Sequence, residues 1–108
     1  MALLHDSLLL QTSTTAATGS WFPLDWRVDS GATLRSFAGS LTVGDTVYME
    51  VTNQRTVDNS GIPVSVSVIA TVSAFTTANF ASAFTGPFFA VRFRKTGTTG
   101  PATVYGIV

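Results

Sequence analysis

The 108-residue sequence contains no cysteine and few charged residues. Without cysteine, the chain can form no disulfide framework, thiolate metal site or cysteine nucleophile. Charged residues make up 11% of the sequence, against roughly 25% in an ordinary soluble domain, and six basic residues balance six acidic ones. A neutral balance argues against general affinity for nucleic acid or for an anionic membrane surface. We therefore expect neither a nucleic-acid partner nor a membrane partner.

The sequence also lacks a long apolar run. No stretch approaches the roughly 18 apolar residues that a membrane span needs. Residues 1–10 are rich in leucine, but His5 and Asp6 interrupt them and no basic residue precedes them, so they fit a secretory signal poorly. We expect a chain that is soluble when synthesised and is used whole. Its first strand begins at Leu8; alternatively, residues 1–7 form an arm that packs on a neighbour through Leu3 and Leu4.

Hydroxyl side chains take the place of charge, since the chain has 17 threonines and 11 serines. Threonine, valine and phenylalanine favour strands, whereas the helix formers glutamate and lysine are scarce. Turn signals recur at strand-like intervals, and no linker separates them. We predict an all-β fold, with one antiparallel β-sandwich or jelly-roll-like domain of seven to eight strands over residues 8–108. At most one short helix is expected near residues 77–84, where Phe80 and Phe84 are four apart; a packed loop is the alternative.

Two segments show clear alternation of apolar and polar residues. In 46–53, Val47, Met49 and Val51 alternate with polar or aromatic neighbours, which indicates a strand with a core face and an outer face. Residues 62–75 give the strongest alternation in the chain. An uncharged β-prone segment is an aggregation hazard when exposed, so we expect its apolar face to be covered. That face consists of Val64, Val66, Val68, Ala70, Val72 and Ala74.

No group of residues has the pattern of a catalytic site. His5 is the one histidine, and no strand–turn–helix elbow surrounds any serine, so a serine triad is disfavoured. Asp25 and Asp29 could share a calcium ion, but no spacing resembles a calcium loop. Asp45 and Asp58 lie beside turn residues, where aspartate usually stabilises the turn itself. We expect no enzyme activity, no catalytic residue, no metal and no cofactor.

Two clusters remain as candidate contact sites. Arg92, Arg94 and Lys95 are half of the basic residues, and on a strand both arginines would share the face opposite Phe93. That face is a polar outer surface, a charged guard of a sheet edge or a protein contact, and a nucleic-acid stripe is disfavoured because no second basic patch supports it. Trp21 and Trp26 are core residues, protein-interface anchors or platforms for sugar rings.

Two stretches resemble known structural proteins. The first runs from Gly19-Ser20-Trp21-Phe22-Pro23 to Phe37-Ala38-Gly39-Ser40-Leu41. The second comprises Gly86-Pro87-Phe88-Phe89-Ala90-Val91-Arg92 and Gly100-Pro101-Ala102-Thr103-Val104-Tyr105-Gly106. Together they resemble small β-sandwich virion proteins of tailed bacteriophages, which decorate or cement a capsid or lie at its vertices and tail.

The resemblance implies a structural protein that is made in the host cytoplasm and works in the virion. Its partners would be other virion proteins, and it would be a homo-oligomer, for which a closed trimer is one form. Capsid decoration is the first expectation. A tail, neck or fibre component is the alternative, and a carbohydrate- or receptor-binding module is another. The residues that we expect at the protein interface are Leu3, Leu4, Trp21, Trp26, Arg92, Arg94 and Lys95.

Overall fold

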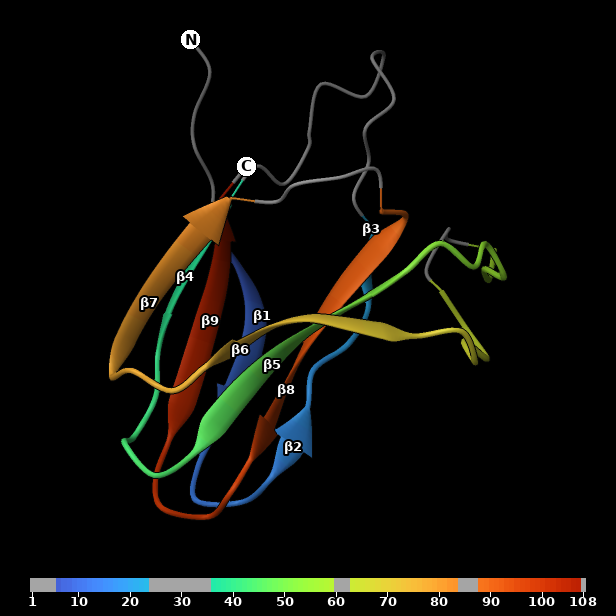
Figure 1. Ribbon diagram of the computed structural model, residues 1–108. Coiled ribbons are helices and arrows are strands. Elements are labelled where there is room, and N and C mark those ends of the chain that lie inside the picture. Colours follow the sequence, from blue (N-terminus) through green and yellow to red (C-terminus); the bar gives the residue numbers. More distant parts are fainter. Residues whose placement is uncertain (1–5, 24–35, 60–62, 84–87, 108) are drawn as a thin grey trace, which may run out of the picture.

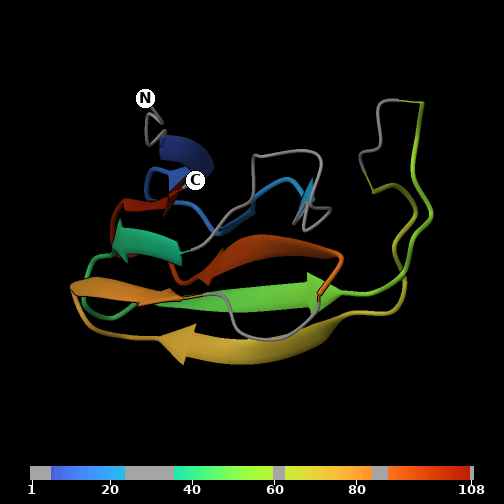
Figure 2. The same cartoon turned by 90° about the horizontal axis from the view of Figure 1, so that it is seen from above.

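The chain folds into two antiparallel β-sheets that pack face to face (Figures 1 and 2). The computed structural model describes residues 6–23, 36–59, 63–83 and 88–107. One sheet has four strands, in the order β1 (Asp6–Thr12), β9 (Ala102–Ile107), β4 (Ser36–Ser40) and β7 (Asn79–Ala83). The other sheet has the order β2 (Ala17–Thr18), β8 (Ala90–Thr96), β5 (Thr46–Thr52) and β6 (Ala70–Phe75), and β3 (Phe22–Pro23) also pairs with β8.

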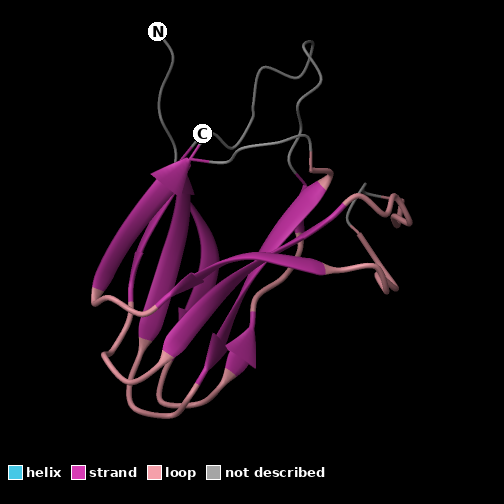
Figure 3. Cartoon of the chain, in the orientation of Figure 1, coloured by secondary structure: helices cyan, strands magenta, loops and turns pink. Residues whose placement is uncertain are grey.

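The predicted all-β sandwich is therefore confirmed. Strands and loops account for all the described residues, and no helix occurs among them (Figure 3). Hence no described helix could cross a membrane. Of the predicted arm, residues 1–5 lie outside the described residues, and Asp6 and Ser7 already belong to β1.

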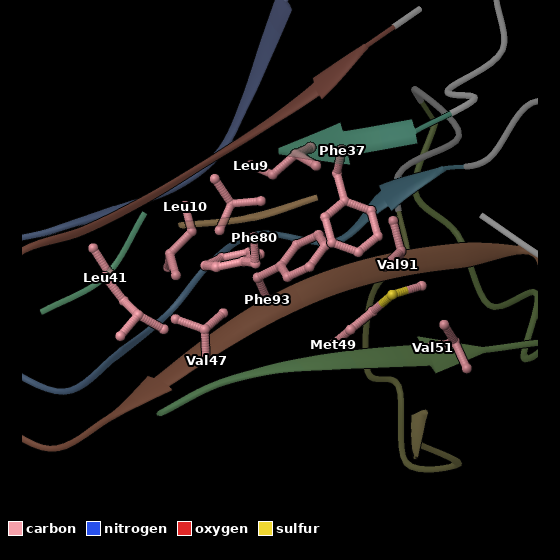
Figure 4. Packing of buried hydrophobic residues seen from close by; sticks show 12 residues of the cluster. Leu9, Leu10, Phe37, Leu41, Val47, Met49, Val51, Phe80, Val91 and Phe93 are labelled. Carbon is pink, nitrogen blue, oxygen red and sulfur yellow. The ribbon is translucent and has the colours of Figure 1, made fainter. Parts of the chain in front are cut away.

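The hydrophobic core lies between the two sheets (Figure 4). In β5, Val47, Met49 and Val51 face inward, as their alternation predicts. Phe37 of β4 is fully buried, and its ring centroid lies 4.9 Å from that of Phe93 in the opposite sheet. The core cluster consists of Leu9, Leu10, Phe37, Leu41, Val47, Met49, Val51, Phe80, Val91, Phe93, Ala102 and Val104.

The segment between β6 and β8 differs from expectation. In place of a helical turn or packed loop, residues 79–83 form β7, which pairs with β4. Phe80 is buried opposite Gly39, and its ring stacks on Phe75 with centroids 4.5 Å apart. A β-carbon at Gly39 would lie 2.6 Å from Phe80 Cζ, so the glycine makes room for this ring. Phe84 lies outside the described residues.

The prediction of a buried strand over 62–75 is wrong for most of its length. Only Ala70–Phe75 forms a strand, and the preceding residues belong to a loop that projects beyond the ends of β5 and β6 (Figure 1). Val68 is 68% exposed and Val72 is 42% exposed, and Val64 and Ile69 are also exposed. Alternation predicts an extended backbone with two unlike faces. Alternation does not predict whether a second layer covers the apolar face. None of the described residues covers the exposed valines of this segment.

Candidate functional site

Five side chains form a connected cluster on the outer face of the five-stranded sheet. They are Trp21, Tyr48, Glu50, Arg92 and Arg94, and we call them the arginine face. Glu50 lies opposite Arg92 and Tyr48 lies opposite Arg94 in the β5–β8 pairing. Trp21 directly precedes β3, whose Phe22 pairs with Val91. Since residues two apart share a face of a strand, the register brings all five side chains to one side of the sheet.

Glu50 holds the two arginines together. Its Oε1 accepts a hydrogen bond of 2.7 Å from Arg92 Nε, and its Oε2 accepts one of 3.1 Å from Arg94 Nε. The carboxylate is nearly buried, whereas the side chains of Arg92 and Arg94 are 22% and 33% exposed. Burial raises the pKa of Glu50, but the two arginines outweigh it and hold this pKa below its usual value. The cluster therefore carries two positive charges and one negative charge.

Each arginine also lies over an aromatic ring. Arg92 Cζ is 4.6 Å from the ring centroid of Trp21, and Arg94 Cζ is 4.6 Å from that of Tyr48. Cation–π contacts of this kind stabilise partly exposed pairs by about 0.5–1 kcal/mol. Both guanidinium groups are thus fixed by a ring and by Glu50. Within the described residues, Nε is the one nitrogen of each guanidinium with a hydrogen-bond acceptor, and the terminal nitrogens have none there.

An open groove of about 310 Å³ borders Trp21. Its lining comprises Leu8–Gln11 and Ala17–Phe22, which include no titratable side chain. Across the described residues, no three histidine or carboxylate side chains gather where they could hold a metal ion. The chemistry that the described residues offer at this face is contact through stacked aromatic and guanidinium groups.

The structure brings together three of the seven predicted interface residues, Trp21, Arg92 and Arg94. Leu3, Leu4 and Trp26 lie outside the described residues. Sequence reasoning missed Tyr48 and Glu50 as members of the cluster. The alternation of residues 46–53 places both on the outer face, and that signal could have found them once β5 was paired with β8.

The prediction that Lys95 belongs to the interface is wrong, because its side chain is buried in the molecule. Lys95 is 1% exposed, and its Nζ lies 3.2 Å from Asp45 Oδ2. Nζ also donates to the carbonyl oxygens of Ser13, Thr15 and Gly100. Lys95 alternates with Arg94, so it points to the same side of β8 as Phe93. It joins three loops at one end of the sandwich.

Asp45 completes this buried junction. Its carboxylate accepts hydrogen bonds from the backbone N–H groups of Thr99 (3.0 Å) and Gly100 (3.1 Å) in the β8–β9 turn. Gly97 in the same turn has a φ of +95°, and a β-carbon there would lie 2.2 Å from Asp45 Oδ1. The sequence predicts that Asp45 stabilises its own turn, but its carboxylate instead stabilises the β8–β9 turn, more than fifty positions later in the chain.

The junction makes stability depend on acidity. Burial raises the pKa of Asp45, but hydrogen bonds from Thr99, Gly100 and Lys95 outweigh it and lower the pKa from 3.8 to about 2. The unfolded chain therefore takes up this proton at a higher pH than the folded chain, so acid favours unfolding. In urea unfolding, the stability difference between wild type and Asp45→Asn should be constant above about pH 5 and should shrink as the pH falls from about 5 to about 2. A difference that stays constant down to pH 2 would contradict this assignment.

Gln54 shapes the projecting loop, which comprises residues 53–59 and 63–69. Its side-chain oxygen accepts hydrogen bonds from the backbone N–H groups of Ser67 (2.8 Å) and Val68 (3.0 Å), and its nitrogen donates to Ser65 O (3.2 Å). Ser65 has a φ of 53°, a left-handed conformation that serine seldom adopts. One amide side chain thus ties the two arms of the loop together.

Comparison of the chain with family models, curated proteins and solved structures found no match.

Proposed function

We propose that this protein is a non-enzymatic structural component of a bacteriophage particle, a decoration or cement protein that binds capsid subunits through the arginine face. The observation that carries the proposal is the composition of this face. Tryptophan, tyrosine and arginine are the residue types most enriched among those that dominate protein–protein binding. Four such side chains lie together here and are partly exposed. The Glu50 carboxylate joins the two arginines, and each arginine lies over one of the aromatic rings. The resemblance to small β-sandwich virion proteins supports the same function.

The proposed mechanism is adhesion by a prearranged surface. Binding normally costs side-chain entropy, about 0.5–1.5 kcal/mol for each flexible side chain that becomes fixed. Glu50, Trp21 and Tyr48 already restrain both arginines, so part of this cost is met during folding. The terminal nitrogens, which have no acceptor among the described residues, can then donate to carboxylates or backbone carbonyls of a neighbour. Many copies bound across subunit boundaries would stabilise the assembled shell by mass action.

The geometry favours protein contact over sugar stacking. A sugar-binding tryptophan presents an open ring face, whereas the Arg92 guanidinium covers one face of Trp21. In the carbohydrate-binding alternative, a sugar ring would therefore stack on the other face of Trp21. Placement on the tail or neck instead of the head requires the same adhesive chemistry, and the location of the protein in purified particles distinguishes the two.

Replacing either Trp21 or Arg94 by alanine should remove most of the protein from the particle. Hot-spot truncations cost at least about 2 kcal/mol each, so we expect affinity to fall by more than about 30-fold for either variant. Particles of the phage that encodes the chain, produced without it, are incubated with purified variants, and bound copies are counted by quantitative mass spectrometry and located by electron microscopy. Tyr105→Ala is the matched control, since Tyr105 is an exposed aromatic residue on the other sheet.

Two results would overturn the proposal. The first is absence of the wild-type protein from particles assembled in its presence. The second is undiminished binding by folded Trp21→Ala and Arg94→Ala variants, with folding checked by circular dichroism. Glycan binding by the isolated protein that is lost in Trp21→Ala would instead support the carbohydrate-binding alternative.

A further inference from the structure

Strand β6 leaves one backbone edge of the five-stranded sheet open. It pairs with β5 on one side and with no described strand on the other (Figure 1). Such an edge presents N–H and C=O groups that can pair with a further strand. The other end of this sheet is made of the two-residue strands β2 and β3, which offer little length for pairing. Among the described strands, β6 is therefore the long edge of this sheet that has no partner on its outer side.

Natural proteins usually protect a long edge strand with charged residues, proline or a bulge. No charged residue occurs anywhere from Asn59 to Val91, and β6 contains no proline. One device is present, because the pairing steps from Met49↔Ser73 to Glu50↔Thr71 and leaves Val72 as an extra residue. Val72 is 42% exposed at this point, so the bulge displays an apolar side chain at the edge.

We infer that β6 is a pairing edge between two copies of this chain, which join antiparallel about a two-fold axis through this strand. The inference goes beyond the proposed function, since it involves neither the arginine face nor a particle. Its support is the lack of charge along this edge, which spares a strand that pairs with its own copy any like-charge repulsion. In a two-fold antiparallel pair, residues of one strand lie opposite residues of the same strand in the partner. Charges near the axis would face like charges, and β6 and the residues that precede it carry none.

Pairing of this kind also accounts for exposed apolar side chains near the edge. Val68 and Ile69 directly precede β6 and are exposed, as is Val72 within it. The β6 strand of a second copy would form backbone hydrogen bonds with the outer edge of β6. It would also lie near Val68 and Ile69, which directly precede this strand. The two five-stranded sheets would then form one continuous sheet. Side chains of the partner strand would then lie beside Val72 and contact it across the new strand pair.

The chain has no cysteine, so single cysteines can map this edge without background. We expect a disulfide-linked dimer on mild oxidation of one of three variants, Thr71→Cys, Val72→Cys or Ser73→Cys. The variant that cross-links is the one whose cysteine lies nearest the two-fold axis. Cross-strand neighbours in an antiparallel pair have β-carbon separations suited to a disulfide. Tyr105→Cys is the control, because Tyr105 is 44% exposed, close to the 42% of Val72, but lies on the other sheet.

The association itself is measured by sedimentation equilibrium on the full chain. Wild type should be a dimer, and Val72→Lys should be a monomer with an unchanged far-ultraviolet circular dichroism spectrum, because lysine blocks edge pairing. Tyr105→Lys should remain a dimer. The inference is overturned if wild type is monomeric at high micromolar concentration, if Val72→Lys associates like wild type, or if Tyr105→Cys cross-links as readily as the β6 cysteines. Particle binding by monomeric Val72→Lys would separate this inference from the proposed function.

Discussion

Lys95→Met should lower the free energy of unfolding by roughly 3–5 kcal/mol, the usual cost of breaking a buried ion pair by removing one partner. Methionine fills a similar volume, so the loss is electrostatic. Asp45 would keep a buried carboxylate without its cation, and the carbonyl oxygens of Ser13, Thr15 and Gly100 would lose a donor. Small domains are stable by only about 5–15 kcal/mol, so this variant should be close to unfolding at physiological temperature.

Urea unfolding followed by tryptophan fluorescence measures this effect. Arg94→Met is the control on the same strand, since it breaks a partly exposed pair with Glu50 and should cost less than about 1 kcal/mol. The double variant Lys95→Met/Asp45→Asn should recover part of the loss, because it also removes the uncompensated charge. If Lys95→Met unfolded at the same urea concentration as wild type, the buried ion pair would not contribute to stability as described.

Phe37→Ala should cost about 3–5 kcal/mol, as for other phenylalanines truncated in a core. Phe37 is 1% exposed and contacts rings from both sheets. Its centroid lies 4.9 Å from that of Phe93 and 5.5 Å from that of Phe75 in the opposite sheet, and 6.5 Å from that of Phe80 in its own sheet. Removal of this ring leaves a cavity beside the rings of Phe75, Phe80 and Phe93.

Phe37→Leu should lose less stability than Phe37→Ala, because leucine fills most of the cavity. Tyr105→Ala, which truncates an exposed aromatic residue of β9, should change stability by less than about 0.5 kcal/mol. Thermal unfolding by calorimetry ranks the three variants. Equal losses for Phe37→Ala and Tyr105→Ala would mean that the aromatic cluster does not hold the two sheets together.

Local periodicity predicted the fold where strands have one face in the core. Residues 46–52 form β5 with Val47, Met49 and Val51 inward, and residues 90–96 form β8 with Phe93 inward. It failed in residues 63–69, which alternate equally well but lie beyond the end of the neighbouring strand. The difference between these segments is whether a second layer faces them, and this depends on the pairing of distant strands.

The candidate site was predictable in part for the same reason. The basic cluster and Trp21 stand out in the sequence, but their meeting depends on the pairing of β3 and β5 with β8. Arg92, Arg94 and Lys95 form one basic cluster in the sequence, but they do not share one face of β8. The period of two places Lys95 with Phe93, and the presence of a carboxylate to receive it inside depends on Asp45, fifty positions earlier in the sequence.

The strand order also determines when the protein can fold during translation. β8 and β9 are interior strands of the two sheets, and each lies between strands that precede it in the chain. Of the pairings between described strands, only β4–β7 and β5–β6 can therefore form before residues 90–107 have emerged from the ribosome. Until then, the apolar residues of β1, β4 and β5 have no completed core to enter. Non-local pairing of this kind is slow, so the nascent chain should depend on protection from aggregation until translation passes β9.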